Sequence, residues 1–123
     1  MEHKEIWKSI PASTCTGPYW HIADYYEASS LGHIRNKKTG NILMPTLCGG
    51  NNLTGEQPHL ALNIDCPRWK GQRIHVRVSH LVWAAFTGEP VDNVRIYHLD
   101  GDCWNNAFYN LATYDTLKRL GLR

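Results

Sequence analysis

A short, almost unbroken run of apolar residues, "SHLVWAAFTG" (79–88), most constrains what this chain can fold into. Ser79 is a residue type that caps the start of helices, and Gly88 is one that ends them, so the run predicts a short helix. A helix that is apolar on nearly every side has no polar face to turn to water. We therefore expect this helix to be mostly buried.

Two segments before this helix alternate apolar and polar residues, which is typical of strands. They are "HLALNID" (59–65) and "RIHVRVS" (73–79). The second segment turns its isoleucine and valines to one face and His75 and Arg77 to the other. That basic face is either ordinary solvated surface or a surface for phosphate.

Turn-forming residues divide the rest of the chain into short pieces. We expect a strand at 5–11, a hairpin at 25–45 with a polar turn at 37–40, a flexible connection at 47–58, a strand at 94–99, and helices at 105–112 and 114–121. Asp115 can cap the last of these helices, and Gly121 can end it.

Composition limits the class of protein. A chain of 123 residues with 42% hydrophobic and 20% charged residues predicts one soluble globular domain, residues 1–123. The net charge is only +2, so total charge argues weakly for nucleic acid. No apolar run approaches membrane-spanning length, which argues against a membrane partner.

The four cysteines, Cys15, Cys48, Cys66 and Cys103, are scattered along the chain. Scattered ligands can form a zinc site, but the chain lacks the C-x-x-C pairs whose spacing would support one. No signal peptide precedes the cysteines, so we expect free thiols in a reducing cytoplasm rather than two disulfides.

Two parts of the chain together resemble a known protein family. "EIWKSIP" and "YYEASSLGHIRN" (5–11 and 25–36) are similar to the NUMOD4 motif, although about a dozen extra residues separate them and His33 replaces a common arginine. "VSHLVWAAFTG" and "VRIYHLDGDCWNNAFYNL" (78–88 and 94–111) are similar to the HNH endonuclease pattern. The resemblance covers most of the chain, about 4–45 for NUMOD4 and about 72–121 for HNH.

The resemblance implies an α+β fold, in which a NUMOD4-type β-hairpin region packs on a ββα-metal (HNH/His-Me finger) core. It implies a nuclease, that is, a hydrolase that acts on DNA phosphodiester bonds. By the same resemblance His98 is the general base that takes a proton from the attacking water, and Asn110 holds the loop of that histidine. Asn105 and Asn106 match the paired asparagines of the pattern.

The metal-ligand positions depart from the pattern. The family places one ligand immediately before the catalytic histidine, where this chain has Tyr97, and another nine residues after Asn110, where it has Arg119. A neutral phenol is a poor ligand for Mg²⁺ and a guanidinium cannot coordinate a cation. Carboxylates could substitute in a shifted site: Asp115, one helical turn before Arg119, together with Asp100 or Asp102 in the turn.

Two functions therefore stay open. One is an active HNH endonuclease, which needs Mg²⁺ or another divalent cation. The other is a degenerate member without cofactor that binds double-stranded DNA or a host protein and does not cut. In either case the resemblance implies a bacteriophage-encoded protein in the cytoplasm of an infected bacterial cell. The basic residues assigned to nucleic-acid binding are Arg35, Lys37, Lys38, Arg73, Arg77 and Arg119.

Overall fold

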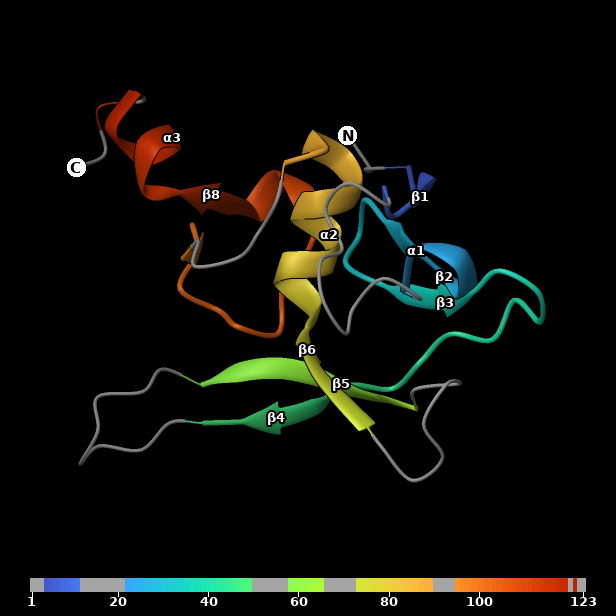
Figure 1. The fold of residues 1–123 in the computed structure, drawn as a ribbon. Coiled ribbons are helices and arrows are strands. Elements are labelled where there is room, and N and C mark those ends of the chain that lie inside the picture. Colours follow the sequence, from blue (N-terminus) through green and yellow to red (C-terminus); the bar gives the residue numbers. More distant parts are fainter. Residues whose placement is uncertain are drawn as a thin grey trace.

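The structure is a computed structural model that describes residues 4–11, 22–49, 58–65, 73–89, 95–119 and 121. Within these residues, three small β-sheets lie around the helix α2 (Figure 1). In chain order the elements are β1 (Trp7–Ser9), α1 (Ile22–Tyr25), β2 (Tyr26–Ser29), β3 (Ile34–Asn36), β4 (Thr46–Cys48), β5 (His59–Asp65), β6 (Arg73–Arg77), α2 (Val78–Thr87), β7 (Ile96–His98), a 3-10 helix (Phe108–Asn110), β8 (Leu111–Thr113) and α3 (Tyr114–Arg119).

Helix α2 is the apolar run identified in the sequence, but it begins at Val78, one residue before the predicted cap. Arg77 occupies the cap position in an extended conformation without a side-chain capping bond. Ser79 lies inside the helix and is buried, so its prediction as the N-cap is wrong, because β6 passes directly into the helix. The end is as predicted: Gly88 has a φ of 73°, and its N–H donates to the carbonyl oxygen of Ala84 at 2.9 Å.

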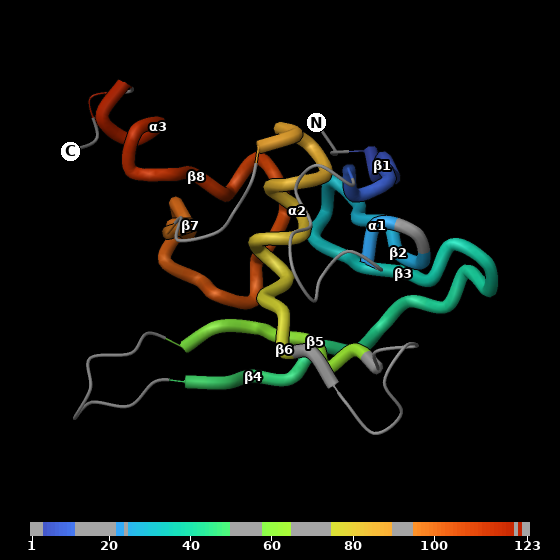
Figure 2. The backbone as a smooth tube through the Cα atoms, viewed as in Figure 1, coloured from blue at the N-terminus to red at the C-terminus, as the bar shows by residue number. Residues whose placement is uncertain are grey.

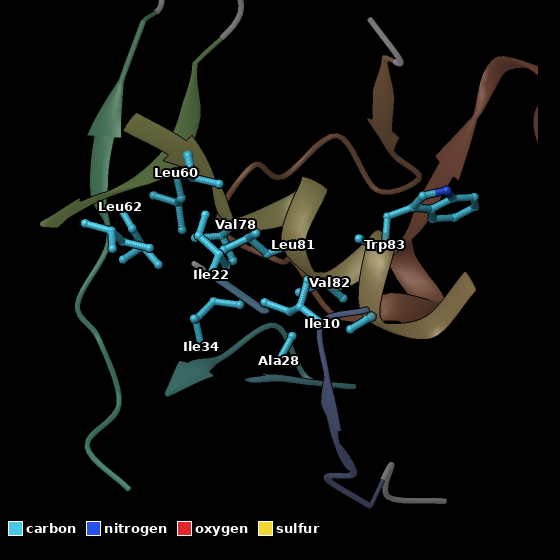
Figure 3. Packing of buried hydrophobic residues seen from close by; sticks show 14 of the residues in the cluster. Ile10, Ile22, Ala28, Ile34, Leu60, Leu62, Val78, Leu81, Val82 and Trp83 are labelled. Carbon is cyan, nitrogen blue, oxygen red and sulfur yellow. The ribbon is translucent and has the colours of Figure 1, made fainter. Parts of the chain in front are cut away.

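The core of the protein forms around α2, which contacts both three-stranded sheets and the 3-10 helix. Val82 is fully buried and Leu81 is nearly so. Figure 3 shows side chains of α2 directed toward apolar residues of both sheets, among them Ala28 and Leu60. Removing one such side chain, as in Leu81→Ala, would cost about 2–5 kcal/mol of stability because the site is close-packed.

The N-terminal sheet has the order β1-β2-β3, with antiparallel pairing throughout. The predicted turn at 37–40 is present, since the N–H of Gly40 donates to the carbonyl oxygen of Asn36 at 2.8 Å. Beyond that turn, Ile42 forms a single bridge to Arg35. The predicted hairpin therefore exists, but the fuller pairing in this region is between β2 and β3.

The middle sheet has the order β4-β5-β6 and is also antiparallel. Strands β5 and β6 confirm the prediction from alternation. β4 differs from the prediction, which assigned Leu47 and Cys48 to a flexible connection. These two residues pair with Leu60 and His59 and form a short edge strand.

The C-terminal part is the strand pair β7–β8 followed by α3, which Figure 2 lets the reader trace along the chain. The predicted helix at 105–112 is mostly wrong: only Phe108–Asn110 form a short 3-10 helix. Asn105, Asn106 and Ala107 are not helical, and Leu111 and Ala112 pair with His98 and Tyr97. Thr113, and not the predicted Asp115, caps the start of α3: its Oγ1 accepts from the N–H of Thr116 at 3.3 Å, and Asp115 lies inside the first turn. Within the described residues, no helix has the length and apolar character needed to cross a bilayer.

Candidate active site

His98 is the last residue of β7 and is half-buried. Its Nε2 lies 2.7 Å from Oδ1 of Asn106, which is 4% exposed. Nδ2 of Asn106 donates to the carbonyl oxygen of Cys103 at 3.1 Å, which fixes which end of the amide faces the imidazole. Oδ1 can only accept, so this network assigns the ring proton to Nε2 and leaves the lone pair on Nδ1.

Asn110 connects the two ends of the loop that follows His98. Its Oδ1 accepts from the N–H of Asp100 at 3.1 Å, and its Nδ2 donates to Asp100 Oδ1 and to the carbonyl oxygen of Asn105, both at 2.9 Å. Its own carbonyl oxygen accepts from the N–H of Leu99 at 2.8 Å. Asn110 is buried, so these bonds are shielded from competing water. The side chain therefore lies where it can hold the loop of His98, and its role in catalysis stays a prediction.

Asp100 is the anionic centre of this loop. Oδ2 accepts from Nδ2 of Asn105 at 3.0 Å, and Oδ1 accepts from the backbone N–H of Asp102 at 2.8 Å in addition to Asn110. These hydrogen bonds, that of Asn105 first, stabilise the carboxylate and lower the pKa of Asp100 from 3.8 to about 2. Asp100 is thus ionised at any ordinary pH and is committed to the geometry of the turn.

The N-terminal sheet supports the same loop from outside. The N–H of Phe108 donates to the carbonyl oxygen of Ser30 at 2.8 Å, and Gly32 lies directly against the backbone of Asn106 and Ala107. Gly32 has a φ of 91°, in the left-handed region that glycine adopts readily. The turn between β2 and β3 thus backs the segment that carries the partner of His98, a contact that the sequence did not indicate.

Three residues of the N-terminal motif form a hydrogen-bonded cluster that fixes this turn. Oε2 of Glu5 accepts from Oγ of Ser29 at 2.8 Å and lies 2.5 Å from Nδ1 of His33. Partial burial acts to raise the pKa of the Glu5 carboxyl, but the hydrogen bonds of His33 and Ser29 outweigh it and lower that pKa. The Ser29 oxygen also accepts from the N–H groups of Leu31 and His33, so the cluster shapes the turn that contains Gly32.

The two positions where the resemblance places metal ligands do not fit a divalent cation. Tyr97 is half-buried in β7 with the guanidinium of Arg95 5.3 Å from the centre of its ring. Arg119 is exposed at the end of α3. Asp115, in the first turn of α3, is exposed, and its carboxylate is the type of ligand that Mg²⁺ takes. In the part of the chain that the structure describes, the one group of three close metal-binding side chains lies elsewhere, at Cys48, His59 and His75.

The basic residues assigned to nucleic acid do not all face water in the same way. Nε of Arg35 lies 2.5 Å from Oε1 of Glu27, and its guanidinium stacks on the ring of Trp7 at 3.9 Å. Lys37 is exposed, but its Nζ donates to the carbonyl oxygen of Ala23 at 2.7 Å. The other exposed members are Lys38, Arg77 and Arg119, and the side chain of Arg73 lies outside the described part of the structure.

Comparison with known proteins agrees with this arrangement. The NUMOD4 motif matches residues 5–53. A solved structure of the HNH homing endonuclease I-HmuI, reported for DNA binding and cleavage, is similar with a TM-score of 0.59 and 18% sequence identity. The similarity covers 96% of this chain, which spans 60% of that protein's chain. No curated protein matches the sequence. The chain therefore carries a NUMOD4 motif on the α+β fold of an HNH endonuclease, as the resemblance implied.

Proposed function

We propose that this protein, a NUMOD4 motif joined to an HNH endonuclease fold, hydrolyses phosphodiester bonds of DNA. The observation that carries the proposal is the tautomer of His98. The Asn106 amide holds the proton on Nε2, so Nδ1 is the nitrogen with a lone pair. A histidine kept in this form is suited to act as a general base.

In the proposed reaction Nδ1 of His98 accepts a proton from a water molecule as its oxygen attacks the phosphorus. The bond from phosphorus to the leaving oxygen then breaks, its electron pair stays on that oxygen, and the oxygen takes a proton from solvent. The imidazolium that forms keeps its Nε2–H donated to Oδ1 of Asn106, so the ring does not need to rotate during the step. Asn110 and Asp100 keep the loop of His98 closed throughout.

A divalent cation, Mg²⁺ or another, would offset charge on the phosphate. We assign the carboxylate of Asp115 as its ligand in this chain, with Asp100 as a second ligand. Asp100 already uses both of its oxygens in the turn, which favours Asp115 as the main ligand. Tyr97 and Arg119, at the family's ligand positions, take no part in this assignment.

Tyr97 and Arg119 favour a second function, because neither side chain suits a divalent cation. Arg119 is exposed at the position of a ligand, and its guanidinium could clasp a phosphate directly. The protein would then bind double-stranded DNA, or a host protein, without cutting and without a cofactor. For either function the resemblance supports a phage-encoded protein that acts in the cytoplasm of an infected bacterial cell.

Nicking of supercoiled plasmid tests the proposal. Purified protein with Mg²⁺ or Mn²⁺ should convert the plasmid to the open-circular form, and His98→Ala should abolish this while circular dichroism shows an unchanged fold. Met44→Ala is the matched control, because Met44 is 86% exposed and lies outside the site. Failure to nick any DNA with any divalent metal would refute the nuclease proposal, and DNA affinity without nicking would then support the second function.

A further inference from the structure

We propose that the β4-β5-β6 sheet carries a zinc-type metal site formed by Cys48, His59 and His75. Each residue offers one ligand atom, and the three atoms lie within 4.8 Å of one another. The cluster contains none of the residues assigned to the candidate active site.

Sheet register brings these distant residues together. Cys48 on β4 pairs directly with His59 on β5, so the two side chains leave the same face of the sheet. On that face β5 continues with Ala61 and then Asn63, which pairs with His75 on β6. Ala61 is small, which leaves room for the two imidazoles to approach across it. Their ring centres are 5.8 Å apart and their planes are at 86°.

Asn63 orients His75 for metal binding. Nδ1 of His75 lies 3.3 Å from Oδ1 of Asn63, so a protonated Nδ1 donates to the amide and Nε2 keeps its lone pair. A histidine that binds a metal through one nitrogen usually donates its other N–H to such an acceptor. This contact therefore supplies the outer support that a metal-bound imidazole needs.

The ligand set selects the kind of ion. One thiolate and two imidazoles suit Zn²⁺ and similar borderline metals, whereas Mg²⁺ and Ca²⁺ prefer oxygen. Zinc bonds of about 2.0–2.3 Å place tetrahedral ligand atoms roughly 3.5 Å apart. Side-chain rotations that move the ligand atoms by about 1 Å would therefore bring all three to bonding distance of one ion. Cys48 is half-buried and His59 is 7% exposed, while His75 is exposed, which leaves the ion open to water as a fourth ligand.

Such an ion would tie the edge strand β4 to the hairpin that leads into α2 (Figure 1). The three-residue β4 is held to the sheet by one partner strand, so a metal bond at Cys48 would add a strong link at its end. Binding displaces the proton of the Cys48 thiol to solvent, and the thiolate then coordinates the ion. The site's role is therefore to stabilise this sheet.

Cobalt spectroscopy on the whole chain, stripped of metal and kept reduced, tests the proposal. One equivalent of Co²⁺ should give visible bands of tetrahedral cobalt together with the near-ultraviolet charge-transfer band of a cobalt–thiolate bond. One equivalent of Zn²⁺ should remove both bands and raise Tm. If the wild-type protein takes up no stoichiometric cobalt, the proposal is wrong.

Variants separate this site from the candidate active site. Cys48→Ser should lose the charge-transfer band, whereas Cys103→Ser and His98→Ala should keep it. His75→Gln, at an exposed position expected to tolerate it, should weaken cobalt binding even if Cys48→Ser does not fold. Asn63→Ala should weaken binding about 10–100-fold with unchanged bands, as expected for an outer-shell partner. An unchanged thiolate band in a folded Cys48→Ser protein, or unchanged affinity in His75→Gln, would overturn the assignment.

Discussion

Gly32 and Asn106 lie in direct backbone contact, although one belongs to the N-terminal motif and the other to the loop of His98. A Cβ built on Gly32 would stand 2.6 Å from the carbonyl carbon of Asn106 and 2.8 Å from its oxygen. No such pair of atoms can be that close without a shift of backbone. The N-terminal motif therefore acts on the candidate active site through contact rather than as an independent unit.

Gly32→Ala should destabilise the protein and displace Asn106. The alanine meets a left-handed φ of 91°, worth about 1–2 kcal/mol, and the contact with Asn106 adds overpacking of about 1–3 kcal/mol. Urea unfolding measures the cost. Gly40→Ala is the matched control, since Gly40 has a φ of 75° with nothing within 4 Å, so only the strain applies. Equal costs for the two variants would show that the close contact has no energetic weight.

Asn106→Asp should shift the pH dependence of DNA cleavage. The new carboxylate beside Nε2 favours the imidazolium form of His98, and a general base must be neutral. The acidic limb of the pH–rate profile should therefore move to higher pH, with activity recovered in alkali. Asn41→Asp, at an exposed turn residue, is the control for added charge. A profile that falls uniformly without moving would argue against the contact between Asn106 and the base.

Asp100 should make stability fall in strong acid. Its pKa is lowered from 3.8 to about 2 on folding, so the carboxylate contributes fully above pH 3.8, and this contribution is lost as the pH falls through about 2. Asp100→Asn should be less stable than the wild type at pH 7, and the difference should shrink between pH 3.8 and 2. Chemical denaturation over this range measures it. A difference that is constant with pH would show that the charge of Asp100 is not what stabilises the turn.

Arg119 and Arg35 should respond differently to substitution. Arg119 is exposed, so Arg119→Ala should reduce the log–log salt slope of DNA binding by about 0.9 if it neutralises one phosphate. Arg35 is engaged with Glu27 and Trp7, so Arg35→Ala should lower Tm and leave the slope nearly unchanged. Fluorescence anisotropy across a salt series, with and without chelator, measures both. If Arg35→Ala reduced the salt slope and Arg119→Ala did not, Arg35 rather than Arg119 would be the residue that neutralises a phosphate.

Asp115→Asn should weaken Mn²⁺ binding at the candidate active site, because it removes the anionic ligand proposed on α3. Calorimetric titration with Mn²⁺ measures this. Both proteins compared carry His75→Gln, so that the cluster of Cys48, His59 and His75 does not contribute to the binding. Unchanged manganese affinity would exclude Asp115 as a ligand. The absence of manganese binding in the parent protein would exclude the shifted metal site altogether.

The sequence predicted those elements whose local pattern matches their environment. Alternation identified β5 and β6, and the glycine stop at Gly88 marked the end of α2. The prediction from sequence failed at β4, which it assigned to a flexible connection, and at β8, whose first two residues it assigned to a helix. Both strands exist through pairing with β5 and β7, which lie elsewhere in the chain. The prediction also failed at Ser79, where a strand passes into a helix without a side-chain cap.

The residues of the candidate site also fall into two groups: those that a local sequence motif identified and those that only the fold brings together. His98 and Asn110 were identifiable because motif spacing survives within one short loop. Asn106 was noted as part of a pair of asparagines, but its bond to His98 required the folded loop. The contact of Gly32 and the grouping of Cys48 with two histidines join segments far apart in the chain, and no local pattern reports such proximity.

The position of α2 along the chain has a consequence for synthesis on the ribosome. The strands β1, β2 and β3 are complete by Asn36, whereas the helix against which they pack begins only at Val78. In a nascent chain the apolar residues of β1, β2 and β3 therefore stay exposed until α2, the helix against which they pack, has emerged. Contacts between residues so far apart in the sequence slow folding, and they prolong the lifetime of aggregation-prone intermediates that expose apolar surface. Fragments that end before Val78 should accordingly aggregate, and chaperone demand during translation should end only when α2 leaves the exit tunnel.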